Sequence, residues 1–179
     1  ETLWRFRLRR LEAEAIWDGI HAAVGDLDLQ VGGPSFDPTS GKGGRRRGAY
    51  IVRGYSASRE VTPNFLQSFD VDDGRAPCPM RTRTVTAPQA LFLMNSPKVI
   101  EQARAAADSV LKTESETIKR IQLAFQRSLQ RAPAGKELAQ VRDYLDSSTS
   151  GNATEEETRD LWARFIQTLW ATPEFRFLN

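Results

Sequence analysis

The chain has 179 residues, and its 40% hydrophobic, 27% charged and 9% aromatic content excludes wholesale disorder. The chain has one cysteine, which excludes an intrachain disulfide. It also has only one histidine, so a zinc site made of cysteine and histidine ligands is disfavoured. The net charge of +2 lacks the basic excess of nucleic-acid-binding proteins, and no apolar run reaches the roughly 18 residues of a membrane span. We therefore expect no metal, no cofactor, no nucleic-acid partner and no membrane span in this chain.

Residues 2–24 have the spacing of a helix with apolar residues on two opposite faces and charged residues between them. Arg10 and Glu14 are four positions apart, and Arg9 and Glu12 are three apart. Each pair would therefore meet on the surface of that helix. Because a helix with two apolar faces lies between other elements, we expect these ion pairs to be partly buried.

Residues 25–48 form a Gly- and Pro-rich loop, since this composition does not favour regular structure. The loop lacks the spacing of a phosphate-binding loop, because Lys42 is followed by glycine and no strand precedes it. Its arginines at 45–47 are expected to pair with carboxylates of the preceding helix or to lie in solvent. Residues 49–55 follow as the most strand-like run, with residues 81–85 as the best local candidate for its partner.

The chain from residue 86 onward predicts a series of helices, each with an apolar face. Their starts are Thr86 with Gln89, Ser96 before Pro97, Thr113 with Glu116, and Thr154 with Glu157. The last helix has the widest apolar stripe, which is typical of a core face, and we expect the tail after it to pack back on the body. The sequence thus predicts a mainly α fold, a multi-helix, bundle-like single domain over residues 1–179 with one small β element, a hairpin or paired strands, near the middle.

Polar residues that flank the expected core are the best candidates for ligand binding. A buried polar group must be satisfied, so each of them makes either a structural bond or a site. Arginine forks also bind carboxylates and phosphates in a bidentate manner. The candidate ligand-binding residues are Arg9, Arg10, Glu12, Glu14, Arg81, Arg83, Gln89 and Asn95.

Acid–base catalysis would need two carboxylates in one cleft. Glu12 and Glu14 on a helix would point roughly 200° apart, so we expect that they do not serve one site together. Asp70, Asp72 and Asp73 share a loop, where a run of aspartates is usually a solvated turn. We therefore assign no catalytic residue and leave open whether the chain is part of an enzyme.

Several segments occur in an order that resembles a known family. They are Arg-Arg-Leu-Glu-Ala-Glu-Ala-Ile at 9–16, Gly-Gly-Pro at 32–34, Pro-Cys-Pro at 77–79, Thr-Ala-Pro-Gln-Ala-Leu-Phe-Leu-Met-Asn-Ser-Pro at 86–97 and Pro-Glu-Phe at 173–175. Together they resemble the C-terminal domain of unknown function of large planctomycete-type proteins that also have a cytochrome c-like haem module. The resemblance is to the later portion of that domain, so we expect this chain to be a fragment of a larger domain.

The resemblance implies a periplasmic or extracellular parent protein. Haem c is implied for the separate module alone, because this chain has no Cys-x-x-Cys-His motif. We therefore expect a non-catalytic structural or interaction module that contacts other modules of its parent protein, with polysaccharide as a further candidate partner. The alternatives are part of an enzyme that acts on extracellular polysaccharide, and a module that binds anionic glycans through its arginines.

Overall fold

The computed structural model describes residues 8–38, 44–56, 59–60, 62–72, 80–81, 84–148 and 153–178. This part of the chain is mainly helical, with two short antiparallel sheets. The helices are α1 (Ala13–Val24), α2 (Asn64–Ser68), α3 (Ala87–Asn95), α4 (Pro97–Thr113), α5 (Thr117–Leu129), α6 (Gly135–Ser148), α7 (Glu155–Ala171) and α8 (Pro173–Arg176), with the 3-10 turn η1 (Gly48–Tyr50). The strands are β1 (Arg9–Arg10), β2 (Tyr55–Ser56), β3 (Arg59–Glu60) and β4 (Phe177–Leu178).

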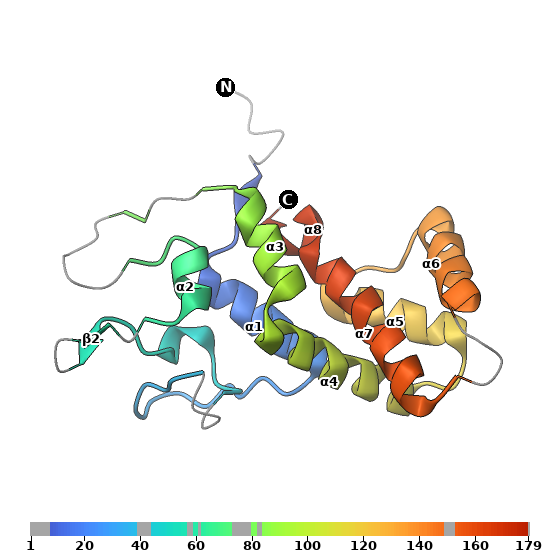
Figure 1. The fold of residues 1–179 in the computed structure, drawn as a ribbon, viewed down its shortest axis with the longest axis horizontal. Helices are drawn as coiled ribbons and strands as arrows, with labels where there is room; N and C mark the ends of the chain where they lie inside the picture. The colour runs from blue at the N-terminus through green and yellow to red at the C-terminus, as the bar shows by residue number, and fades with distance from the viewer. Residues whose placement is uncertain are drawn as a thin grey trace.

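The core lies where α7 packs along α4, with α1, α3 and α5 around the pair (Figure 1). The apolar stripe of α7 is buried as predicted, and Trp170 is fully enclosed. Its indole Nε1 donates to the hydroxyl of Ser128 on α5 at 3.1 Å, which satisfies the polar edge of a buried ring. Helix α6 lies at the edge of the molecule and buries Leu145.

Two of the predicted helix starts carry complete capping boxes. Thr86 begins α3 and Thr154 begins α7, each with the expected glutamine or glutamate three residues later. The predicted start at Thr113 is wrong. Its hydroxyl donates to the Ser109 carbonyl oxygen at 2.7 Å, so Thr113 stays in the last turn of α4, and Glu116 becomes the N-cap of α5.

The first predicted helix is much shorter than residues 2–24. Residues 1–7 lie outside the described part of the chain, and Arg9–Arg10 form strand β1 against β4. The backbone N–H of Leu11 also donates to the carbonyl oxygen of Arg176 at 2.7 Å. Helix α1 therefore begins at Ala13, because the tail of the chain binds the backbone that would have formed its first turns. The expectation that this tail packs back is confirmed.

The small β element near the middle is present, but Tyr55 is the one residue of the predicted strand 49–55 that its described strands include. Gly48–Tyr50 form η1, and Ile51 makes an isolated bridge to Phe36. Strand β2 then pairs with β3, with Tyr55 opposite Glu60. The backbone of Phe36 pairs with Tyr50 and Val52, and β3 pairs with β2, in place of the partner expected from residues 81–85, of which 82 and 83 lie outside the described part.

The Gly- and Pro-rich loop over 25–48 is held to the body by Arg46. Its guanidinium donates to the carbonyl oxygens of Gly32 and Pro34, and it lies 4.0 Å from the ring centroid of Tyr50. The indole of Trp17 on α1 donates to the Arg46 carbonyl oxygen at 2.9 Å. These contacts fix the end of the loop, and hence η1, against α1.

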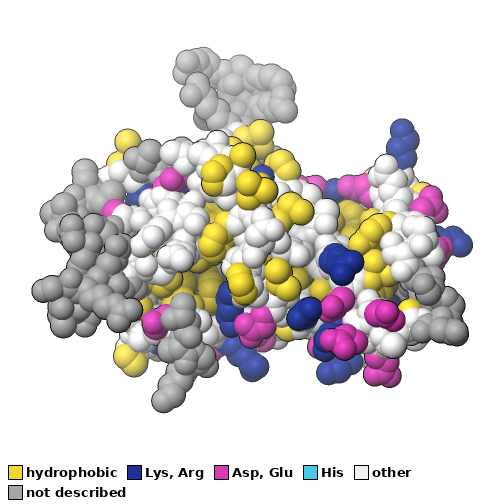
Figure 2. Space-filling view, viewed as in Figure 1, with side chains coloured by type: hydrophobic (Ala, Val, Ile, Leu, Met, Phe, Trp, Pro, Cys, Tyr) yellow, Lys and Arg dark blue, Asp and Glu magenta, His cyan; other side chains and the backbone are white. Residues whose placement is uncertain are grey.

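The surface of α3 is unusually apolar for an outer helix. Leu91 is 55% exposed and Met94 49% exposed, and apolar side chains gather over this part of the molecule in Figure 2. Single exposed apolar side chains are ordinary on soluble proteins, so this strip alone assigns no role. No helix in the described ranges has the length and apolar content needed to cross a membrane.

Candidate functional site

The structure divides the predicted polar residues into a buried network and an open pocket. Arg10 and Gln89 belong to the network, and both are almost fully buried. Their common partner is Asp70, whose Oδ2 lies 2.7 Å from Nη2 of Arg10 and 3.4 Å from Nε2 of Gln89. Thr84 completes the set, donating to Asp70 from both its backbone N–H and its hydroxyl at 2.8 Å.

This network is structural, because its side chains bind one another, although the buried Nε of Arg10 has no hydrogen-bond partner in the described part of the chain. Asp70 has a φ of 63°, a left-handed conformation that aspartate tolerates better than most residues. That conformation lets α2 turn sharply, so the carboxylate lies beside Arg10 of the first strand. Gln89 also accepts from the Thr86 backbone N–H, as the capping box requires. The network thus joins three segments, which are β1 through Arg10, the turn after α2 through Asp70, and α3 through Gln89.

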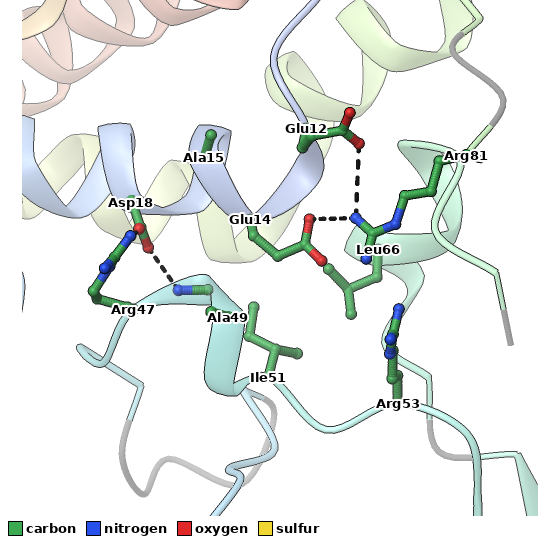
Figure 3. A pocket seen from close by; sticks show the side chains of 11 residues that line it. Glu12, Glu14, Ala15, Asp18, Arg47, Ala49, Ile51, Arg53, Leu66 and Arg81 are labelled. Carbon is green, nitrogen blue, oxygen red and sulfur yellow. Dashed lines mark hydrogen bonds and ion pairs between the residues drawn. The ribbon is translucent and has the colours of Figure 1, made fainter. Parts of the chain in front are cut away.

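A polar pocket of about 470 Å³ lies between α1, η1 and the segment after η1 (Figure 3). Its volume falls in the range of small-ligand sites. Three of the predicted residues line it, together with several that were not predicted. The lining residues are Glu12, Glu14, Ala15, Asp18, Arg47, Gly48, Ala49, Ile51, Arg53, Leu66 and Arg81.

Glu12 and Glu14 approach the same guanidinium, contrary to the expectation that they point apart. Glu14 Oε2 lies 2.8 Å from Nη1 of Arg81, and Glu12 Oε2 lies 3.7 Å from the same atom. The reason is that Glu12 is the N-cap of α1, with an extended backbone at φ −66° and ψ 156°, so the helical angle between the two residues does not apply. The hydrogen bond that the Arg81 guanidinium donates to Glu14 raises the pKa of Arg81.

Asp18 and Arg47 form the other end of the pocket. Arg47 Nε lies 3.1 Å from Asp18 Oδ2, and the Gly48 backbone N–H donates to Asp18 Oδ1 at 2.6 Å. This is the kind of pairing predicted for the arginines at 45–47. Gly48 is necessary here, because a Cβ at this position would lie 2.6 Å from the Glu14 carbonyl oxygen. The close approach of η1 to α1 therefore shapes the pocket wall.

Arg53 is the lining residue that the sequence pattern did not indicate. Its side chain is exposed, and it extends from the segment after η1 toward Leu66 and the Arg81 side of the pocket. Within the described ranges it makes no ion pair or hydrogen bond, whereas Arg47 and Arg81 are both paired. It stands in what the sequence presents as an ordinary strand, so no spacing signal distinguishes it.

The remaining candidates lie apart from these two clusters. Arg9 is exposed on β1, and Asn95 is exposed at the end of α3, where its side chain donates to the Leu91 carbonyl oxygen at 3.0 Å. Arg83 lies outside the described part of the chain, as does Asp73 of the aspartate run.

The single histidine is not a pocket residue. His21 is buried on α1, and its Nδ1 lies 2.8 Å from Asp26 Oδ1. Burial lowers its pKa, and the hydrogen bond with Asp26 opposes that shift. No group of three or more histidine, cysteine, aspartate or glutamate side chains is arranged to hold a metal ion in the ranges that the structure describes.

Comparison with known proteins assigns a family to the chain. The PSD1 family model, described as "Protein of unknown function (DUF1553)", matches residues 1–145, which include every residue that lines the pocket. No curated protein and no solved structure matches the chain. Because the matched range covers most of the sequence, this chain belongs to the PSD1 family of proteins of unknown function (DUF1553).

Proposed function

We propose that this chain is a non-catalytic interaction module that binds a hydroxyl-rich ligand, a segment of polysaccharide, in the pocket between α1 and η1. One observation carries this proposal. The pocket carboxylates Glu14 and Asp18 are held by Arg81 and Arg47, which come from distant parts of the chain. The polar groups of the wall are therefore positioned before any ligand arrives.

A pre-positioned wall of this kind suits neutral hydroxyl groups. Carboxylate oxygens that are bound to arginine still have free lone pairs, so they can accept hydrogen bonds from ligand hydroxyls. The guanidinium N–H groups can donate hydrogen bonds to the oxygens of the same hydroxyls. Because the positive and negative charges of the wall nearly balance, a neutral ligand meets no large opposing field. Ile51 and Leu66 close the wall from the core side, where both are almost fully buried.

The lining offers carboxylate and guanidinium groups, which can bind the hydroxyls of a ligand. The described lining residues include no hydroxyl, thiol or imidazole side chain, and the single histidine is buried against Asp26. The alternative of acid–base catalysis would depend on Glu12 and Glu14, both of which are held by Arg81. An assay for new reducing ends separates that alternative from simple binding.

The test is a thermal-shift and calorimetric titration of the chain with neutral and acidic oligosaccharides. A Glu14→Gln variant removes the central pocket carboxylate, and Glu101→Gln, on the exposed face of α4, is the matched control. We expect the ligand to raise the melting temperature of the unsubstituted chain, called the parent chain below, and of the control, but not that of Glu14→Gln. Absence of a shift with every oligosaccharide in a cooperatively folded chain would overturn the proposal, and release of reducing ends would show an enzyme.

The parent protein is proposed to be a large extracytoplasmic protein of a planctomycete-type bacterium, with a cytochrome c-like module elsewhere in it. The support is the order of motifs from residue 9 to residue 175. Fractionation of the source cells with haem staining tests this. The full-length protein is expected in the periplasmic or secreted fraction and to stain for haem, and a haem-free cytoplasmic protein would contradict it.

A further inference from the structure

We propose that the ligand of this pocket carries a carboxylate that Arg53 binds, so that its class is a uronic acid unit within a polysaccharide. This inference rests on the proposed binding function and names the chemistry that the pocket selects. Arg53 is the starting point, because its exposed guanidinium lines the pocket without a carboxylate partner in the described part of the chain.

Among the residues that the structure describes, the guanidinium of Arg53 has no carboxylate partner, whereas those of Arg47 and Arg81 are paired. Arg81 is engaged by Glu14 and Glu12, and Arg47 by Asp18. A free guanidinium offers a planar fork of N–H donors, which matches the two oxygens of a carboxylate. Arg53 is therefore the lining group best able to form a new charge-assisted pair with a ligand.

The charges of the wall limit how many acidic groups the ligand can bring. The lining has three carboxylates, Glu12, Glu14 and Asp18, and three arginines, so its formal charge is zero. One ligand carboxylate at Arg53 is compensated, but further anionic groups would meet Glu12 and Glu14, which repel them. Densely sulfated or phosphorylated polymers therefore fit poorly, and a unit with one carboxylate and several hydroxyls fits well.

The other groups of the pocket suit the neutral part of such a unit. Glu14 and Asp18 stand across the pocket from Arg53 in Figure 3, where they can accept from ligand hydroxyls. Leu66, of which 1% is exposed, and Ile51, of which 5% is exposed, are core residues that close the pocket beside Arg53 and leave little of their own surface to a ligand. The arrangement thus offers an anion-binding end and a hydroxyl-binding end.

The experiment compares a neutral oligosaccharide that carries a single glucuronic acid unit with the methyl ester of that unit, which keeps the hydroxyls and removes the charge. Titration calorimetry uses the parent chain, Arg53→Gln and the control Arg164→Gln, which alters an exposed arginine of α7 outside the pocket. We expect the parent chain and the control to bind the acid about tenfold more tightly than the ester, as one charge-assisted pair provides. In Arg53→Gln the two forms should bind equally, and its melting temperature should be unchanged because the side chain is exposed.

Three other results of this titration would contradict the proposal. Equal binding of acid and ester by the parent chain would overturn the role of Arg53 while leaving the proposed binding function in place. A preference for the acid that persists in Arg53→Gln would also overturn it, because another cation would then hold the carboxylate. Failure of the folded parent chain to bind either form would reject this ligand class and count against the proposed function as well.

Discussion

Oδ2 of Asp70 lies 2.7 Å from Nη2 of Arg10, and 60 positions of the chain separate the two residues. The Arg10 side chain is 2% exposed and that of Asp70 is 20% exposed, so the pair is largely removed from water. The pair joins the first described strand to the turn after α2. It also explains why an arginine is tolerated in the interior, since a buried charge without a partner is strongly unfavourable.

We therefore expect Asp70→Asn to destabilise the chain by about 3 kcal/mol, because it leaves the charge of Arg10 buried and uncompensated. Asparagine keeps the shape of the side chain and tolerates the left-handed backbone, so the charge is the main change. Denaturant unfolding measures the loss. The control is Asp160→Asn, which breaks a more exposed pair with Arg104 and should cost less than about 1 kcal/mol. Equal losses of unfolding free energy in the two variants would show that burial does not determine how much the Arg10–Asp70 pair contributes to stability.

Gly48→Ala should separate η1 from α1, since the added Cβ would lie 2.6 Å from a backbone oxygen of Glu14. We expect a loss of about 1–3 kcal/mol in unfolding free energy, typical of overpacking, together with loss of binding in the pocket. Gly44→Ala is the matched control, because nothing lies within 4 Å of its added Cβ. A Gly48→Ala chain with parent-like stability and binding would show that this approach is not needed.

His21 should make stability depend on pH below neutrality. Burial lowers its pKa from the ordinary 6.5, so the unfolded chain binds this proton more readily than the folded chain does. Its contribution is fully present above pH 6.5 and is lost as the pH falls through the lower folded pKa. Melting temperatures from pH 8 to pH 5 should fall in the parent chain and fall less in His21→Gln. Identical slopes in the two chains would contradict this assignment.

Arg131 joins the start of α6 to α8 by pairing with Glu137 at 2.7 Å and Glu174 at 2.5 Å. The guanidinium holds the pKa of Glu137 at about 2. Because these side chains are about one third exposed, we expect Arg131→Met to cost only about 1 kcal/mol. Hydrogen exchange should nevertheless quicken in both α6 and α8. Lys119→Met, which breaks an exposed pair within α5, should leave both helices unchanged.

Local signals in the sequence were enough to predict the later helices. The capping boxes at Thr86 and Thr154 and the apolar stripe of α7 depend on residues within a few positions of one another. Such patterns are read from one segment alone, so the mainly α class could be predicted. The error at Thr113 shows the limit, because two cap-like residues, Thr113 and Glu116, compete for the same short connection.

The candidate site was predicted less well, because it depends on contacts between distant segments. Glu12 leaves the helix because β4 binds the preceding strand, and no signal near Glu12 reveals that. Arg81 and Glu14 are 67 positions apart, so their pairing is not encoded in a local spacing. Arg53 becomes notable because Arg47 and Arg81 are paired, whereas Arg53 has no ion pair with any residue that the structure describes. Sequence patterns identified three lining residues, and the tertiary fold determined which of them meet.

The ladder between β1 and β4 also determines how the molecule would respond to mechanical tension. Arg9 lies opposite Leu178 and Arg10 opposite Phe177, so the chain enters and leaves this antiparallel ladder on the same side. A force that pulls the two ends apart would load these backbone hydrogen bonds one after another, as in unzipping, instead of shearing them together. Rupture in an optical trap should therefore begin at low force, freeing the tail before the helices around α7 separate.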